Sequence, residues 1–469
     1  MRTVIENIER SYEKPVVSLV STWVLMIPLL VFASQWGFSF EHGSMNTALA
    51  SRSGDTGEMG IAVKSQTAIC YLICTYFVMR SPHRFFRNAL NNKLLYALPF
   101  LSLLSVLWSQ YPTVTFTHAV FLTANIAFAL CLLDRFSTND LLKVLLTTGT
   151  VAAIGSLLLI VALPRFGIQE RSSITSGAWQ GIFPQKNICG SIMTALLLPA
   201  FYVQIKSRTA GILRSCYVLV VLAIIAMSRS AGAWLTCSAC LLFVLCMHLI
   251  VRLPNKEIIA ISFLTTSVIG LVAFLTLRNF TTLMYALGKD PTLTGRTTLW
   301  TVLLNSAMKH PLLGYGYSAF WSMDLKGESA NAQIALHWRM GYAENGVIQL
   351  LLELGVIGVL LYGLVFFRAT KDAITCILNK PSPAVKWYVA YLFYMTVSNI
   401  ESGKLLAISD LDLILSLVVF AGLRREVCES EARTRSEAVA WRFTFDLQHQ
   451  GAPRCLSPPK LPRCENCPL

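Results

Sequence analysis

The stretch Leu141–Leu163, LLKVLLTTGTVAAIGSLLLIVAL, decides the class of this protein. Lys143 is the only ionisable side chain in it. A bilayer core about 30 Å thick is crossed by a helix of about 20 apolar residues. The whole chain fits this pattern, because its 469 residues are 54% hydrophobic and only 14% charged, with a mean hydropathy of +0.57. Soluble proteins carry about 25% charged residues, so we expect a membrane protein.

Apolar stretches of similar length recur along the chain, and they predict an all-α polytopic membrane protein with about 12 transmembrane helices. None alternates in the manner of a membrane barrel strand. No small-residue cleavage site follows the first stretch, which we therefore take as a permanent span. The predicted spans are 16–35, 61–79, 94–109, 114–133, 141–163, 188–205, 210–227, 231–250, 257–277, 342–367, 384–400 and 405–423.

The positive charge of the chain follows the expected membrane topology. The net charge is +14, from 39 Lys and Arg against 25 Asp and Glu. With the N-terminus inside, 26 of the 39 basic residues fall on the cytoplasmic side, which is the positive-inside bias. This distribution favours twelve spans with both termini in the cytoplasm, and it argues against a nucleic-acid partner.

The predicted organisation has three parts. Residues 1–15 form a cytoplasmic N-terminus, and residues 16–423 form the transmembrane domain with one long extracytoplasmic loop at 278–341. Residues 424–469 form a cytoplasmic tail rich in Pro and Arg, for which we expect disorder. The tail carries the pair Cys464 and Cys467, a weak zinc signal without a second pair.

The long loop is predicted to contain a short amphipathic helix over Thr297–Lys309, ended by Pro311. Arg296 then lies in the first helical turn, where the helix dipole favours an anion. Trp300 and Trp321 are expected to anchor this region at the membrane interface.

Further cations lie on the outer side, where the topological bias disfavours them. Arg229 occupies the short turn Ser228–Ser230 between two predicted spans, and Lys186 precedes another span. Arg229 could be an interfacial arginine that reaches toward lipid headgroups. Alternatively it could bind phosphate, since a guanidinium forms planar, paired hydrogen bonds with phosphate oxygens. With Arg296, these cations suit a diphosphate.

Two outer residues are candidates for a general base. Glu344 begins the predicted span 342–367, and His337 lies seven residues upstream. Either could accept a proton from a hydroxyl, although a carboxylate at a helix start also fits a purely structural role. Glu353 lies deeper in the same span, and we expect it to be structural or to line a channel. The outer histidines are not spaced as metal ligands, so no metal site is predicted.

Five stretches together resemble the O-antigen ligase and polymerase superfamily of bacterial envelope glycosyltransferases. The hallmark region of that family resembles the Gly-Arg-x-x-x-Trp of 295–300, the His-Pro-Leu-Leu-Gly-Tyr-Gly of 310–316 and the Glu-Asn-Gly-x-x-Gln-Leu-Leu-Leu-Glu-Leu-Gly-x-x-Gly of 344–358. Residues 179–187, with Trp, Gly-Ile-Phe and Lys-Asn, and the Ser-Arg-Ser of 228–230 are similar to the exopolysaccharide polymerase branch.

The resemblance implies an inverting transfer, without metal or cofactor, from an undecaprenyl-diphosphate-linked glycan to a lipid-linked saccharide acceptor at the periplasmic face of the bacterial inner membrane. It implies essential roles for Arg229 and Arg296, while Glu344 and His337 remain the candidate bases from their own position and chemistry. Family members commonly have histidine where this chain has Gln185 and Glu344. The residues expected to bind substrate are Lys186, Asn187, Trp179, Arg171, Asn345 and Trp300.

Three functions remain open from the sequence. The resemblance favours polymerisation of lipid-linked repeat units into exopolysaccharide, with a chain-length regulator as a possible partner. A ligase that transfers finished glycan to a lipid or protein acceptor would share the same donor chemistry. A polysaccharide or lipid transporter would instead place charged residues deep in several spans, whereas here the basic residues gather at the outer edge.

Overall fold

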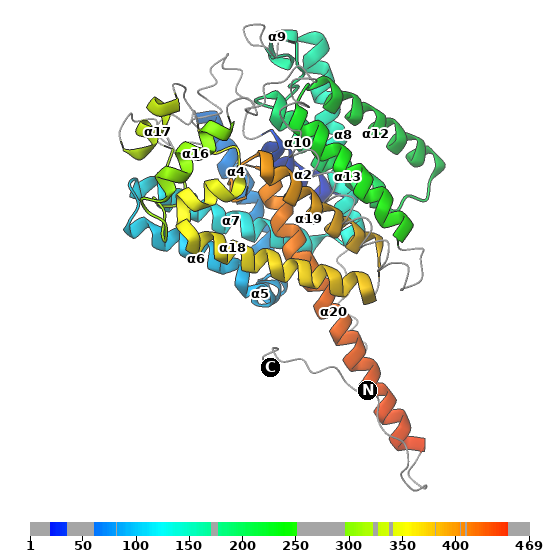
Figure 1. Ribbon diagram of the computed structural model, residues 1–469. Helices are drawn as coiled ribbons and strands as arrows, with labels where there is room; N and C mark the ends of the chain where they lie inside the picture. The colour runs from blue at the N-terminus through cyan, green and yellow to red at the C-terminus, as the bar shows by residue number, and fades with distance from the viewer. Residues whose placement is uncertain are drawn as a thin grey trace. The chain divides into compact units, whose positions relative to one another are not determined.

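The computed structural model describes residues 19–34, 61–80, 82–169, 177–250, 296–321, 327–336, 341–379, 381–403, 405–408 and 410–448. Every named element within these ranges is a helix (Figure 1), which confirms the all-α expectation. The chain divides into two units, Met1–Arg425 and Glu426–Leu469.

The described helices fall into three groups along the chain. The first comprises α2 (Leu19–Ala33), α4 (Ile61–Arg80), α5 (Pro82–Asn91), η1 (Lys93–Tyr96), α6 (Ala97–Leu104), η2 (Ser105–Leu107), α7 (Pro112–Arg135), α8 (Thr138–Ala162) and α9 (Pro164–Gly167). The second comprises α10 (Lys186–Leu197), α11 (Pro199–Tyr202), α12 (Arg208–Met227) and α13 (Ala231–Ile250). The third comprises α16 (Arg296–Ala307), α17 (Glu328–Leu336), α18 (Gly346–Asn379), α19 (Pro383–Glu401) and α20 (Leu411–Gln448).

Five of the described helices, α7, α8, α12, α13 and α18, are long and apolar enough to cross a membrane. A sixth span is possible if 85–91 and 93–107, which meet at 85°, are taken as one broken element. These helices confirm a multi-pass membrane protein. The total of about 12 stays a prediction, and the expected span at 257–277 lies outside the described residues.

The predicted span 188–205 is divided by a proline. α10 ends at Leu197, and Pro199 begins the short α11, because proline has no N–H to continue the helical hydrogen bonds. α10 packs closely on α13 at Gly190, where a Cβ atom would lie 2.4 Å from that of Ala233. This close packing brings the N-terminal end of α10 to the turn that precedes α13.

α18 is broken at Gly355, whose backbone angles of φ 64° and ψ −166° interrupt the helix. The segment 310–316 satisfies the backbone groups that this break releases: Val356 N–H donates to Pro311 O at 2.8 Å, and Gly316 N–H donates to Glu353 O at 3.0 Å. A helix inside a membrane tolerates such a break only where its backbone finds new partners. The motifs at 310–316 and 344–358 are therefore the two halves of one structural joint.

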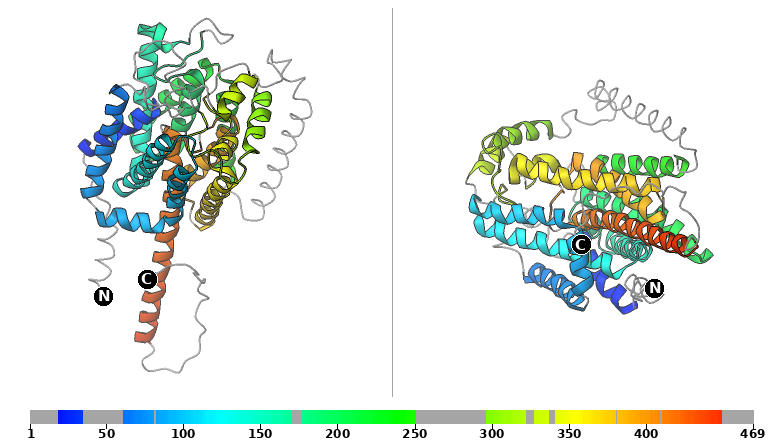
Figure 2. Two further views of the ribbon diagram at one scale, coloured as in Figure 1. Left: turned by 90° about the vertical axis from the view of Figure 1, so that its left-hand side faces the viewer. Right: turned by 90° about the horizontal axis from the view of Figure 1, so that it is seen from below.

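The chain that follows this joint enters the helical bundle. Tyr317 is fully buried, and its hydroxyl donates to Leu406 O at 2.7 Å. Its N–H donates to Ser105 Oγ at 3.1 Å. α18 runs beside α6, as both views of Figure 2 show. Part of the predicted outer loop is thus internal structure, which the loop's polar composition concealed.

The predicted loop helix exists as α16 and begins at Arg296. Leu299 and Leu303, from the predicted apolar face, are buried against α17 and α18, whereas Met308 is 72% exposed. The prediction of Trp321 as an interfacial anchor is wrong. This indole is 3% exposed, and its Nε1–H donates to Gln349 at 3.0 Å.

The tail also differs from its prediction. α20 continues as helix to Gln448, within the stretch for which disorder was expected. Residues 426–448 are rich in Glu, Ala and Arg, which are strong helix formers. The Cys464–Cys467 pair lies outside the described residues.

Candidate functional site

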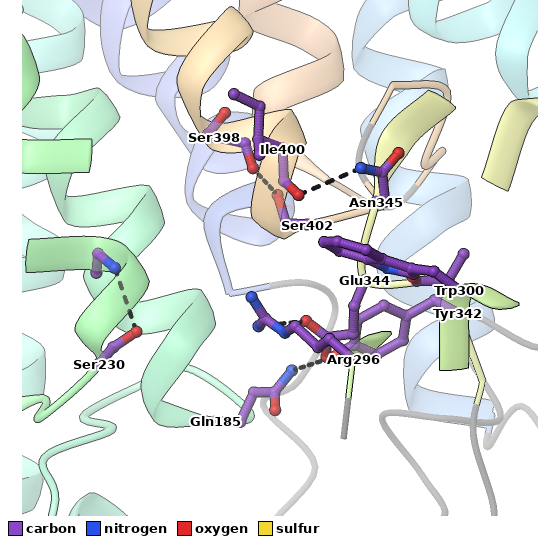
Figure 3. Close-up of polar contacts among 12 residues, drawn as sticks. Gln185, Ser230, Arg296, Trp300, Tyr342, Glu344, Asn345, Ser398, Ile400 and Ser402 are labelled. Carbon is purple, nitrogen blue, oxygen red and sulfur yellow. Dashed lines mark hydrogen bonds and ion pairs between the residues drawn. The ribbon is translucent and has the colours of Figure 1, made fainter. Parts of the chain in front are cut away.

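The centre of the candidate site is an ion pair between the starts of two helices. Arg296, the first residue of α16, donates from Nη2 to Glu344 Oε2 at 2.7 Å (Figure 3). The two side chains are 25% and 15% exposed, so they are shielded yet reachable from outside. An anion that entered here would meet a guanidinium and the N-terminal end of α16, which both favour negative charge.

The backbone around Glu344 is held on both sides. Glu344 itself has φ 51°, a left-handed conformation that costs a residue with a side chain about 1–2 kcal/mol. Before it, Ala343 N–H donates to Gln349 Oε1 at 2.9 Å, and Ala343 O accepts from Trp300 Nε1 at 3.0 Å. After it, Asn345 Oδ1 caps α18 by accepting from two backbone N–H groups at 3.0 and 3.1 Å. The backbone conformation of Glu344 and the hydrogen bonds of its two neighbours therefore fix the direction of its carboxylate.

A second group of residues meets the first through Gln185. Its Nε2 donates to the hydroxyl of Tyr342 at 3.2 Å, two residues before Glu344 (Figure 3). The next residue, Lys186, donates from Nζ to Arg229 O at 3.3 Å. The structure thus joins residues that the sequence separates by more than a hundred positions.

Arg229 lies in the turn between α12 and α13, as predicted, and it also has a left-handed backbone with φ 50°. A Cβ atom at Gly177 would lie 3.8 Å from Arg229 Nη1, so the guanidinium passes beside a residue without a side chain. Trp179 N–H donates to Met227 O at 3.0 Å, so the segment 177–179 is held against the same turn.

The far end of α16 is fixed to α17 by a charged contact. Lys309 Nζ donates to Glu328 Oε1 at 2.7 Å. Partial burial alone would raise the pKa of Glu328, but hydrogen bonds from Lys309, Ser306 and Asn331 outweigh it, and the pKa is lowered. Burial, with the nearby Glu328 charge, raises the pKa of Tyr315 to about 12, and its hydroxyl donates to Ser306 O at 2.8 Å. α16 is therefore held firmly enough to present Arg296.

The remaining predicted residues divide by whether they are described. Asn187 lies in the first turn of α10. Asn345 and Trp300 have their polar atoms engaged with the protein backbone, so any contact with substrate would use their remaining surfaces. Arg171 and His337 lie outside the described residues, and their roles stay predictions.

The sequence interpretation named Gln185 and Glu353 but gave neither a contact in this site, and it did not select Tyr342 or Gln349. Tyr342, Gln349 and Gln185 all contact it directly, and Glu353 hydrogen-bonds to Gln349 at 2.6 Å. The spacing of Gln349 and Glu353 was a usable signal, because residues four apart on a helix face each other.

A multi-pass helical membrane protein with cations gathered at helix starts is the class that the fold and the site define. Residues 216–363 match the sequence profile of the family described as O-antigen ligase, a range that contains Arg229, Arg296 and Glu344. Over these residues the chain is similar to that family, in agreement with the resemblance that its motifs carry.

The chain is also similar to the exopolysaccharide production protein ExoQ of Rhizobium meliloti (strain 1021). The two are 26% identical over 318 residues, which cover 64% of this chain and 70% of the relative.

Proposed function

We propose that this protein polymerises lipid-linked oligosaccharide repeat units into exopolysaccharide or an O-antigen-like polymer at the outer face of a bacterial inner membrane. The observation that carries the proposal is the Arg296–Glu344 pair, 2.7 Å apart at the starts of α16 and α18. Tyr342, two residues before Glu344, hydrogen-bonds to Gln185, and the next residue, Lys186, donates to the backbone carbonyl of Arg229. A cation cluster beside a positioned carboxylate suits transfer from a diphosphate donor to a hydroxyl.

The donor is a glycan whose anomeric carbon is bonded to a polyprenyl diphosphate, with the lipid remaining in the bilayer. Arg296, Arg229 and Lys186 bind the diphosphate and stabilise the negative charge that grows as the bond between anomeric carbon and phosphate oxygen breaks. This charge stabilisation comes from the protein's own cations, so the proposed transfer is independent of a metal.

The acceptor is a hydroxyl on another lipid-linked saccharide. Glu344 accepts its proton while the oxygen attacks the anomeric carbon from the face opposite the diphosphate, which inverts the configuration there. When diphosphate binds, it competes with Glu344 for Arg296, and the freed carboxylate becomes available as the base. The products are an extended glycan, free polyprenyl diphosphate and one proton.

A ligase function is the second candidate, because the matched family is described as O-antigen ligase. It would use the same donor and the same cations, and it would differ in the acceptor. Supplying purified protein with lipid-linked repeat units alone distinguishes the two. A polymerase builds long glycans and releases polyprenyl diphosphate, whereas a ligase leaves single units until its own acceptor is added.

The test uses the full chain reconstituted in vesicles with lipid-linked repeat units. Arg296→Ala and Arg229→Ala should each slow release of polyprenyl diphosphate by about 10²–10³-fold. Arg208→Ala, which removes an exposed arginine from the start of α12, is the matched control and should leave the rate unchanged. Normal rates in both site variants would refute the proposed site. Movement of the intact lipid-linked substrate across the vesicle membrane, without release of polyprenyl diphosphate, would identify a transporter.

A further inference from the structure

A small cavity of about 40 Å³ lies behind the Glu344 turn. Its lining includes Tyr342 and Gln349, which also belong to the candidate site, together with His118 and Ser318. Glu353, on the same wall, is a buried carboxylate on the first half of the broken helix α18. An acidic group at this depth requires a role, because its burial is costly.

The hydrogen bonds of Glu353 lead directly to the candidate site. Its Oε1 accepts from Gln349 Nε2 at 2.6 Å. In turn, Gln349 Oε1 accepts from Ala343 N–H at 2.9 Å and from Trp321 Nε1–H at 3.0 Å. Both of these groups can only donate, so the amide oxygen must face them and the amide nitrogen must face an acceptor. Glu353 is that acceptor.

The same carboxylate holds a second strained position. Three described residues other than glycine have a positive φ: Arg229, Ser318 and Glu344, at 50°, 55° and 51°. The backbone of Ser318 hydrogen-bonds to the Glu353 carboxylate, and Glu344 follows the residue that Gln349 holds. Strained backbone persists only where surrounding contacts over-determine it, and here Glu353 contributes to two of the three positions.

We propose that Glu353 is a positioning residue for glycan transfer. Through Gln349 it fixes the backbone at Ala343, and thereby the direction of the Glu344 carboxylate and its pairing with Arg296. This inference rests on the function proposed above. Glu353 makes no contact with substrate, and its removal weakens catalysis by misplacing Glu344.

Removal of the carboxylate is the first test. Glu353→Met keeps a similar length and leaves Gln349 without its acceptor. A misplacement of about 1 Å can cost about 100-fold in rate, so we expect kcat for polyprenyl diphosphate release to fall by about 10–100-fold while KM for the donor changes by less than about 3-fold. Leaving the Gln349 amide without its acceptor costs stability, so the Tm of the variant is measured beside its kcat to show that it is folded. The exchange described next keeps a donor and an acceptor in place.

An exchange of the two partners is the second test. Gln349→Glu alone places two carboxylates together and should lower kcat. Adding Glu353→Gln restores a donor and an acceptor in reversed order, since the new amide can donate to the new carboxylate. We expect the kcat of the double variant to be at least about 10-fold higher than that of Gln349→Glu alone. Such a rescue shows that the two residues are energetically coupled.

Asp372→Asn is the matched control, because Asp372 is another buried carboxylate on α18, and it pairs with Arg424, outside the candidate site, at 3.8 Å. It should leave kcat unchanged. The proposal is overturned if Glu353→Met retains normal kcat, or if the double variant is no faster than Gln349→Glu. If Arg296→Ala also retains normal activity, the proposed function fails as well. If only Arg296→Ala loses activity, the positioning role alone fails.

Discussion

Gly355 is the position where a single added methyl group tests the broken helix most directly. In Gly355→Ala the new Cβ atom would lie 2.2 Å from Leu312 O and 2.5 Å from Leu313 N, both backbone atoms that cannot turn aside. The residue also has φ 64° and ψ −166°, a combination that is essentially restricted to glycine. The backbone of 310–316 must therefore move away from α18.

The cost follows from these contacts. Forcing alanine into that backbone region costs about 1–3 kcal/mol. The displacement also breaks the hydrogen bonds from Val356 N to Pro311 O and from Ile357 N to Leu312 O, at 2.8 and 3.2 Å, worth about 1 kcal/mol each. We expect a loss of about 3–5 kcal/mol in the free energy of unfolding.

The assay is thermal unfolding of the purified protein in detergent, followed through tryptophan fluorescence. Gly355→Ala should lower the apparent Tm by roughly 3–5 °C. Gly363→Ala on the same helix is the matched control, since its new Cβ atom would have no neighbour within 4 Å, and alanine favours the helix over glycine by about 1 kcal/mol. Equal Tm values for the two variants would refute the account of the joint between 310–316 and α18.

Three further outcomes follow from the site. Arg296→Lys keeps the charge but loses the planar, paired donors of the guanidinium, so diphosphate release should recover only partly relative to Arg296→Ala; full recovery would mean that charge alone suffices. Glu344→Gln should lower the rate by about 10²–10⁴-fold and Glu344→His should restore part of it, because both carboxylate and imidazole accept protons; equal rates for the two variants would exclude a base at this position. Because the folded-state pKa of Glu328 is lowered, its pairing with Lys309 stabilises the protein above the pKa of the unfolded chain and is lost as pH falls through the folded value. The Tm difference between the native protein and Glu328→Gln should therefore be largest near pH 7, begin to shrink near the unfolded-chain value of about 4.3, and vanish only below the lower folded-state pKa. A difference that does not depend on pH would contradict this assignment.

Much of the local structure was predictable from the sequence. Composition and apolar runs identified a helical, multi-pass membrane protein, since no other structure buries so many apolar residues in such runs. The start of α16 at Arg296 and the turn at Arg229 also followed from local pattern. These features depend on residues close together in the chain.

The burial of Trp321 and Tyr317 could not be predicted in the same way. A glycine-containing stretch between two predicted helices, such as the one after His310, is typical of a loop. No local signal says that its backbone completes a broken helix forty residues further on. The break at Gly355 was equally hidden, because a single glycine in an apolar run usually remains helical at modest cost.

The sequence by itself determined the class of protein and the motifs that resemble a glycosyltransferase superfamily, and its charge distribution predicted which cations lie on the outer side. The tertiary structure alone decided that Arg296 pairs with Glu344, that Gln185 hydrogen-bonds to Tyr342 beside that pair, and that Glu353 hydrogen-bonds to Gln349 beneath it. The physical reason is one of distance. Helix formation and membrane insertion depend on neighbours within a few turns, whereas an ion pair between residues 48 positions apart exists only when packing has brought two helix starts together.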